Sequence, residues 1–177
     1  MVQMLLQLGA GECHLAGGRK KYARTPLHEA AINGHLDVCR LLVKFGLLVD
    51  YHNTRGRTPL MYAVKGNYVE LARYFVREAS ANANEKNETS VTALYIACQD
   101  GHEEMVNFLV QEANVDVNLS NRTNHAPLHE AVSGGFTRIV DFMRNGADKY
   151  VVDKMGVTVW QGSRQWVCGY VRVASPA

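Results

Sequence analysis

The hexapeptide Thr25-Pro26-Leu27-His28-Glu29-Ala30 opens a pattern that returns three times in this 177-residue chain. The later versions are Thr58-Pro59-Leu60-Met61-Tyr62-Ala63, Thr92-Ala93-Leu94-Tyr95-Ile96-Ala97 and Ala126-Pro127-Leu128-His129-Glu130-Ala131. The four versions begin 33, 34 and 34 residues apart. A period of this length is typical of a solenoid, in which each unit buries its apolar face only on its neighbours and about three units are needed for stability.

Each hexapeptide has the residues of a helix start. Thr25 suits the N-cap position, and Pro26 suits the first helical position, where a missing N–H costs nothing. Gly34 can adopt the left-handed conformation that reverses the chain, and Asn67 in the second unit tolerates that conformation nearly as well. Apolar residues at helical spacing then predict a second helix, and in the first unit they are Leu36, Val38, Leu41, Leu42 and Phe45. The pattern predicts an all-α fold of stacked helix pairs.

The pattern is less regular in the fourth unit and at both ends. Gly146 comes one residue early, so we expect the second helix of that unit to be shortened or slightly bent. Residues 1–8, MVQMLLQL, look like the second half of such a helix, with Gly9 ending it. After Thr158 the apolar period stops, and residues 163–177 either fold over the end of the stack or stay loose.

The segments between successive helix pairs have a constant length. The next opening position comes 12 residues after each residue that ends a second helix: Thr58 after Gly46, Thr92 after Ser80, Ala126 after Asn114 and Thr158 after Gly146. An Asx residue recurs three residues before a turn residue, as Asn53 before Gly56, Asn87 before Ser90, Asn121 before Asn124 and Asp153 before Gly156. Asx side chains shape turns by accepting a hydrogen bond from two residues on. We predict ordered, hairpin-like loops, called fingers below.

From about residue 4 to residue 160 the chain resembles the ankyrin repeat family, on the hexapeptides and their period. The resemblance implies an all-α solenoid of four full repeats with β-hairpin-like loops and partial repeats at both ends. The predicted limits are 1–24 for a partial N-terminal repeat with an extended basic loop, 25–57, 58–91, 92–125 and 126–157 for the four repeats, and 158–177 for a degenerate partial repeat and tail.

The histidines of the hexapeptides are expected to be structural. His28 and His129 are each followed by Glu, as in the HExxH zinc motif, but Ile32 and Ser133 stand where the second His would be. The resemblance implies that this His bonds the opening Thr hydroxyl and a neighbouring loop. His129 should therefore be held less firmly, because Ala126 has no hydroxyl.

The sequence has no pattern typical of an enzyme or of a cofactor site. Gly-rich phosphate-binding motifs and nucleophile motifs find no match. Cys13, Cys39, Cys98 and Cys168 have no metal or disulfide spacing, and reduced thiols favour an intracellular location, cytoplasmic or nuclear. No run approaches the ~20 apolar residues of a membrane span. We therefore expect no catalysis, no cofactor or metal, and no membrane insertion.

The charge is small overall and unevenly distributed. The net charge is +2, made up of +5 in residues 1–66, −6 in residues 67–117 and +3 in residues 118–177. General nucleic-acid binding requires a continuous basic face. A balance so near zero argues against that function.

A protein-binding surface is the functional hypothesis that remains. By analogy with the ankyrin family, partners bind across the concave side formed by the fingers and the first helices. The candidate partner-binding residues are Tyr51, His52, Arg55, Arg57, Tyr62, Lys65 and Ile96, and a basic edge is expected from Arg19, Lys20, Lys21 and Arg24. Because Arg and Tyr are frequent in binding hot spots, we predict binding of an acidic or aromatic-containing segment of another protein. The alternative is a solubilising face with its charges in water.

Three further hypotheses stay open. One is that the chain is a fragment or isoform of a larger ankyrin-containing adaptor, such as a ubiquitin-ligase substrate receptor of the ankyrin and SOCS-box type, although the C-terminal box of that type is not visible. Another is an enzyme with an unrecognised site, since a fold licenses no activity by itself. The third is self-association through uncapped apolar ends of the stack.

Overall fold

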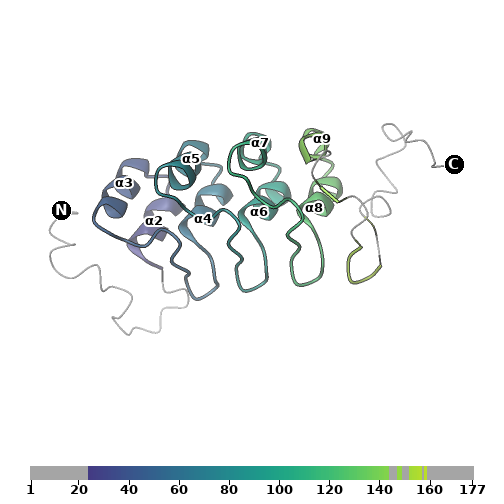
Figure 1. Ribbon diagram of the computed structural model, residues 1–177, viewed down its shortest axis with the longest axis horizontal. Coiled ribbons are helices and arrows are strands. Elements are labelled where there is room, and N and C mark those ends of the chain that lie inside the picture. The colour runs from purple at the N-terminus through teal and green to yellow at the C-terminus, as the bar shows by residue number, and fades with distance from the viewer. Residues whose placement is uncertain (1–23, 144–146, 149–151, 157, 159–177) are drawn as a thin grey trace.

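The computed structural model describes residues 24–143, 147–148, 152–156 and 158. Within this part of the chain, eight helices form two rows (Figure 1). The inner row contains α2 (Pro26–Ile32), α4 (Pro59–Lys65), α6 (Ala93–Asp100) and α8 (Pro127–Ser133). The outer row contains α3 (Leu36–Lys44), α5 (Val69–Arg77), α7 (Glu103–Gln111) and α9 (Thr137–Met143). The predicted all-α solenoid of stacked helix pairs is confirmed.

The sequence motif at the start of the inner helices acts as predicted. Thr25, Thr58 and Thr92 occupy the N-cap positions, and each hydroxyl oxygen accepts a hydrogen bond from the backbone N–H three residues on. Each bond satisfies a donor that the first helical turn leaves without a partner. Ala126 stands at the N-cap of α8 and makes no side-chain hydrogen bond there.

The chain reverses between the helices of each pair at a residue with positive φ. Gly34, Gly101 and Gly135 have φ angles of 70°, 73° and 71°, and Asn67 has a φ angle of 56°. The prediction that Asn67 takes the place of a glycine is therefore confirmed. Asparagine is one of the few residues with a side chain that adopt this conformation readily.

Aromatic rings close over two of these reversals. The Tyr68 ring packs against Gly34 and Gly66, and the Phe136 ring packs against Gly101 and Gly134. A Cβ atom added at Gly101 would lie 2.6 Å from the Phe136 ring. The absence of a side chain at Gly101 is thus needed both for its φ angle and for close contact with the next repeat.

Each finger is closed by its own Asx residue. Asn53 Oδ1 accepts hydrogen bonds from the backbone N–H groups of Arg55 and Arg57 at 2.9 and 3.0 Å. The Asn53 N–H donates to the Arg57 carbonyl at 3.0 Å. Asn87 and Asn121 repeat this arrangement in the next two fingers. The predicted hairpin-like turns are confirmed in these three fingers.

Neighbouring fingers are also joined at their tips. The Glu88 N–H donates to the Arg55 carbonyl at 3.2 Å, and the Arg122 N–H donates to the Thr89 carbonyl at 3.1 Å. The fingers project from the inner row and lie side by side (Figure 1). Their spacing therefore follows the spacing of the repeats.

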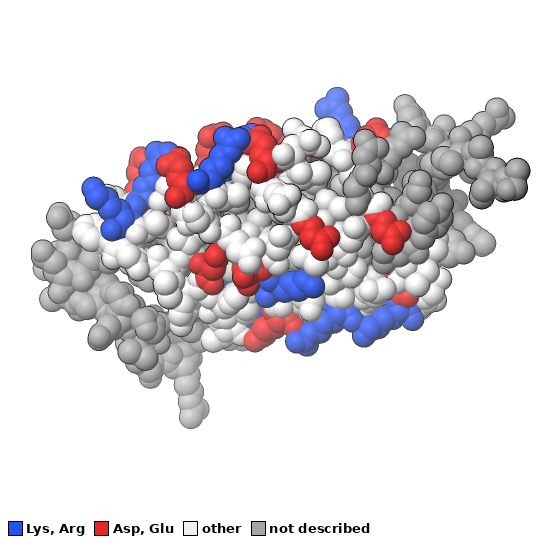
Figure 2. Space-filling model, in the orientation of Figure 1, with Lys and Arg blue, Asp and Glu red and all other residues white. Residues whose placement is uncertain are grey.

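Arginine side chains join the outer helices. The Arg40 guanidinium lies 5.4 Å from the centroid of the Tyr74 ring in the next repeat, and the Arg73 guanidinium lies 5.0 Å from that of Phe108. Arg73 also forms a salt bridge with Glu112 on α7 at 2.8 Å. Figure 2 shows the resulting alternation of basic and acidic side chains along the edge formed by α3, α5 and α7.

Some predictions lie outside the described residues or remain untested. Those outside concern residues 1–8, the turn at Gly9, the run Arg19 to Lys21, Gly146 and residues 163–177. Helix α9 has 7 described residues where α3, α5 and α7 have 9 each, and residues 144–146 after it are not described. The limits of the individual repeats stay predictions.

Alanine substitutions at three glycines near Phe136 separate backbone strain from ring contact. Gly101→Ala should destabilise the protein most, because it combines a positive φ, at a cost of about 1–2 kcal/mol, with a clash against the ring. Gly135→Ala has the positive φ but no atom within 4 Å of the new Cβ, so it should show the backbone cost alone. Gly134→Ala has an ordinary φ and a Cβ 2.3 Å from the ring, so it should show the contact cost alone.

Urea unfolding followed by circular dichroism gives the free energy of unfolding of each glycine variant. Equal losses in Gly101→Ala and Gly135→Ala would contradict the packing role of Phe136.

Candidate functional site

His28 links the first inner helix to the next finger. Its Nδ1 accepts a hydrogen bond from the Thr25 backbone N–H at 3.1 Å, so Nε2 carries the proton in the neutral ring. Nε2 donates to the Arg57 carbonyl at 2.9 Å. The Thr25 hydroxyl lies 2.8 Å from Nδ1 and can donate to it as well. The structural role that the family resemblance implies for His28 is confirmed.

Tyr62, one of the predicted partner-binding residues, lies largely buried at the same junction. Tyr62 is 9% exposed, and its hydroxyl accepts a hydrogen bond from Asn53 Nδ2 at 2.9 Å. The guanidinium groups of Arg24 and Arg57 lie 5.3 and 5.8 Å from its ring centroid. Cation–π contacts such as these contribute about 0.5–1 kcal/mol each at exposed sites. We call Arg24, His28, Arg57 and Tyr62 the Tyr62 cluster.

The arginines around this cluster differ in how their charge is compensated. Arg24 forms an exposed salt bridge with Glu29 at 3.3 Å. Arg55 is exposed on the tip of the first finger. Arg57 Nε is buried, and it has no hydrogen-bond partner among the described residues. The junction between the first two repeats therefore carries three guanidinium groups, one of which has unused hydrogen-bonding capacity.

The other predicted partner-binding residues are placed less favourably for binding. His52 lies 3.1 Å from Glu85 and Lys65 lies 3.2 Å from Asp100, so acidic side chains of the next repeat already face both of them. Tyr51 is half-buried, with its ring edge-on to that of His28. Ile96 is buried in the core and presents no side-chain surface, so the expectation that it contacts a partner is corrected.

The basic surface is short in the part of the chain that the structure describes. Of the predicted basic edge, Arg24 is described, whereas Arg19, Lys20 and Lys21 are not. The second finger contains Glu85 and Glu88 as well as a lysine, and Figure 2 shows side chains of both signs along the finger edge. Among the described residues, the basic character is therefore strongest at the first finger.

A second polar cluster, which the sequence analysis missed, lies between α6 and α8. The Tyr95 hydroxyl donates to Glu130 Oε1 at 2.5 Å and accepts from Asn121 Nδ2 at 3.1 Å. His125 Nδ1 lies 2.7 Å from the same Glu130 oxygen, and its ring stacks on His129. Burial raises the pKa of Tyr95, and the nearby carboxylate raises it further, so its hydroxyl stays protonated. A signal was available, because Tyr95 stands at the place of His28 in its hexapeptide.

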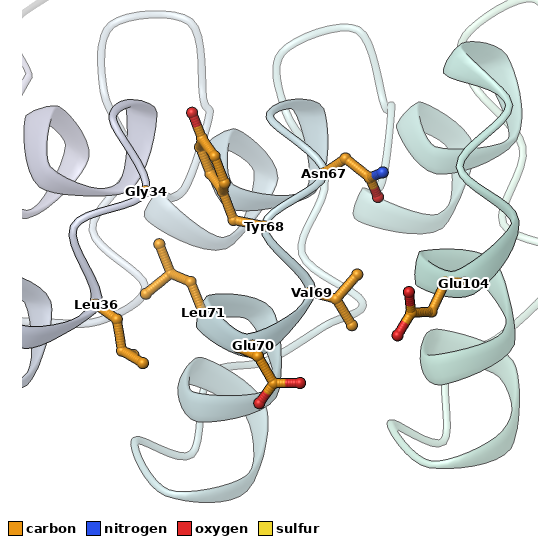
Figure 3. Close-up of a pocket in the computed structure, with 8 residues that line it drawn as sticks. All are labelled: Gly34, Leu36, Asn67, Tyr68, Val69, Glu70, Leu71 and Glu104. Carbon is orange, nitrogen blue, oxygen red and sulfur yellow. The ribbon is translucent and has the colours of Figure 1, made fainter.

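A shallow hollow lies beside the reversals of the first two repeats, at Gly34 and Asn67. Figure 3 shows the Tyr68 side chain beside Gly34, Glu70 on α5 and Glu104 on α7. Leu36, Val69 and Leu71 complete its apolar lining. The residues that line it include no cation, so it differs in charge from the first finger.

The described residues give no support to metal or thiol chemistry. They contain no group of three metal-ligating side chains, and no helix among them is long and apolar enough to cross a membrane. Cys39 and Cys98 are buried, and burial raises the pKa of Cys39 to about 12 and also raises that of Cys98. Neither side chain forms the reactive thiolate near neutral pH.

Comparison with protein families agrees with the observed architecture. A family model described as ankyrin repeats (3 copies) matches residues 1–87 and 75–153, which together make up more than half of the chain. The chain belongs to the ankyrin repeat family.

Several curated proteins are similar over part of their length. The chain is 40% identical over 50 residues to human Protein phosphatase 1 regulatory subunit 27, a match that covers 28% of this chain and 32% of that protein. It is 30% identical over 63 residues to the Notch-regulated ankyrin repeat-containing protein of Xenopus tropicalis, covering 36% of this chain and 55% of that protein. A putative ankyrin repeat protein of Fowlpox virus is 46% identical over 50 residues, covering 28% of this chain and 11% of that protein. Each match spans less than two thirds of the relative.

The pKa of His28 leads to a pH-dependent stability. Burial lowers this pKa below its unfolded value of about 6.5, and the nearby Arg24 lowers it further. The unfolded state therefore binds more protons than the folded state at acid pH. The contribution of neutral His28 to the free energy of unfolding should be fully present above about pH 6.5. Below that pH it should fall, by up to about 1.4 kcal/mol per pH unit.

The matched variants are His28→Gln and His35→Gln, the second at an exposed histidine. Urea unfolding at about pH 7.5 and about pH 5.5 should show a smaller acid loss for His28→Gln than for the wild type. His35→Gln should keep the dependence of the wild type. Parallel acid losses in all three proteins would refute the role of His28.

Proposed function

We propose that this protein-binding module binds an acidic, aromatic-containing segment of another protein at the Tyr62 cluster and Arg55. The family and its regulatory relatives support a non-enzymatic interaction module in general terms. The observation that carries the specific proposal is the grouping of three arginines at one junction, with the guanidinium groups of Arg24 and Arg57 on the Tyr62 ring and Arg55 exposed beside them. A guanidinium group binds a carboxylate through two parallel hydrogen bonds, so the exposed part of the Arg57 side chain suits a partner's Asp or Glu.

The backbone around Arg57 is already fixed for such binding. Its carbonyl accepts from His28 Nε2, and its N–H donates to Asn53 Oδ1. Its side chain packs on the ring of Tyr62. Binding to a preorganised group loses less conformational entropy than binding to a mobile one. The half-buried ring of Tyr51 supplies an apolar surface for an aromatic side chain of the partner.

The charges of the second finger limit how the partner lies. Glu85 and Glu88 would repel an acidic segment that ran on across that finger. His52 and Lys65 are already close to carboxylates, so they contribute less to binding than Arg55 and Arg57. The acidic residues of the partner therefore contact the first finger.

Two broader hypotheses, on the cellular location and on membership of a larger adaptor, do not depend on this binding site. The cytoplasmic or nuclear location of the protein stays a prediction, which microscopy of the tagged protein tests. Membership of a larger adaptor also stays a hypothesis, and the partial matches to the relatives are compatible with it.

Peptide binding tests the site directly. Selection of displayed peptides on the wild-type chain should yield sequences that contain Asp or Glu together with Tyr, Phe or Trp. The double variant Arg55→Glu, Arg57→Glu should weaken their binding at least about tenfold in fluorescence polarisation, because it replaces attraction with repulsion. Tyr62 is left unchanged, because its removal would also leave Asn53 without its partner.

The matched control is Arg122→Glu, which changes the charge of an exposed arginine on the third finger. This variant should bind the selected peptides like the wild type, and all variants should keep the helical circular dichroism spectrum. Undiminished binding by the double variant, or equal loss in the control, would place the site elsewhere.

A further inference from the structure

The shallow hollow at the reversals of the first two repeats has an apolar lining that is partly in contact with water. Half-buried Leu36 and Val69 and buried Leu71 line it, together with the ring of Tyr68, which is 36% exposed. Leu36 begins α3, Val69 and Leu71 lie in α5, and Glu104 of α7 completes the lining (Figure 3). The lining thus comes from three successive repeats. Apolar surface beside charged groups is typical of an interaction site.

The two carboxylates at this hollow are only partly compensated by cations of the described residues. The Glu70 side chain is 80% exposed, and Arg73 lies 3.6 Å from it. Arg73 binds Glu112 more closely, at 2.8 Å, and its guanidinium packs over the ring of Phe108. Glu104 is exposed and forms no salt bridge with another described residue. The hollow therefore combines an apolar lining with negative charge that is available to a partner.

These carboxylates belong to an acidic row that follows the repeats. Asp37, Glu70 and Glu104 stand at the second position of α3, α5 and α7. Arg138 takes the same position in α9 and pairs with Glu103 at 3.3 Å. The row therefore covers the three repeats that line the hollow, and the sign of the charge changes at the fourth repeat.

We propose that the hollow binds an extended basic segment of another protein, in which Lys or Arg recurs among apolar residues. The carboxylates bind the cationic groups, and apolar side chains of the segment cover Leu36, Val69 and the Tyr68 ring. The aliphatic stems of Lys and Arg pack on apolar surface while their charged ends reach a carboxylate. The acidic segment assigned to the first finger would be repelled here. The two sites share no residue, so neither depends on the other.

The spacing of the repeats sets the spacing of the basic residues in the segment. Packed helices lie about 8–10 Å apart, so we expect the carboxylates of Glu70 and Glu104 to be separated by about that distance. In the polyproline II conformation, residues three apart point to the same side and lie about 9 Å apart. A segment with Lys or Arg at every third residue therefore reaches both carboxylates.

The probe for the test is a fluorescein-labelled peptide of four Lys-Pro-Leu triplets, whose prolines favour the polyproline II conformation. Fluorescence polarisation measures its binding to the full chain. Glu104→Lys should weaken binding at least about tenfold, because attraction at the hollow becomes repulsion. The matched control is Asp141→Lys, which makes the same change of net charge at an exposed residue of α9 outside the hollow. This control should bind like the wild type.

Two further peptides separate charge from apolar contact. Four Glu-Pro-Leu triplets should not bind, because their carboxylates are repelled. Four Lys-Pro-Ser triplets should bind at least about tenfold more weakly than the first peptide, because serine covers no apolar surface. The variant Arg55→Glu, Arg57→Glu should bind the Lys-Pro-Leu peptide at least as tightly as the wild type, which distinguishes failure of this site from failure of the first finger.

Glu104 has a second role that the test must separate from binding. A carboxylate in the first turn of α7 also stabilises that helix through its macrodipole. Urea unfolding of each variant measures this effect. The milder variant Glu104→Gln keeps the size of the side chain and should still weaken binding of the Lys-Pro-Leu peptide about threefold.

Several results would overturn the proposal. One is the absence of binding by the Lys-Pro-Leu peptide, and another is equal binding by the Lys-Pro-Ser peptide. Equal losses in Glu104→Lys and Asp141→Lys would show attraction to the net charge alone. Dimers of the wild type in sedimentation velocity that Glu104→Lys abolishes would assign the hollow to a second copy of the chain.

Discussion

Each helix pair in this protein is stabilised mainly by the pairs on either side of it. One position of the outer helices illustrates this constraint, because Tyr74 and Phe108 are buried in the middle of the stack. Leu41 and Phe142 stand at the same position in the first and fourth repeats and are 44% and 37% exposed. Apolar side chains at one position therefore differ in burial according to what the neighbouring repeat places over them, as expected for a solenoid.

Polar contacts between repeats fix the register of the stack. Asp50 and Asn84 each accept a hydrogen bond from a backbone N–H in the following repeat, at 3.0 and 2.8 Å, and Asn118 accepts from that of Asp148 at 2.6 Å. His28 adds its bond to the Arg57 carbonyl. Apolar burial thus supplies most of the stability, whereas these directional bonds align each finger with the next. The proposed binding site depends on that alignment, since Arg57 belongs to the first finger and Tyr62 to the inner helix of the next repeat.

The fold was predictable from the sequence to a large extent, and the candidate site only in part. The caps, the reversals and the Asx turns follow from local sequence, because each depends on residues within a few positions of one another. The burial of Tyr62 and Ile96 and the contact of His52 with Glu85 depend instead on side chains about one repeat away. Periodicity gives a residue's place in its repeat, but it does not give the side chain that the adjacent repeat presents to it.

The central claim is that stability passes from one repeat to the next, and native-state hydrogen exchange along the wild-type stack measures it most directly. The account predicts the slowest exchange in α4, α5, α6 and α7, which have a described helix pair on each side, and faster exchange in α2 and α9. Equal protection in all eight helices would show that the chain unfolds as one unit. Strongest protection in α2 or α9 would contradict the account.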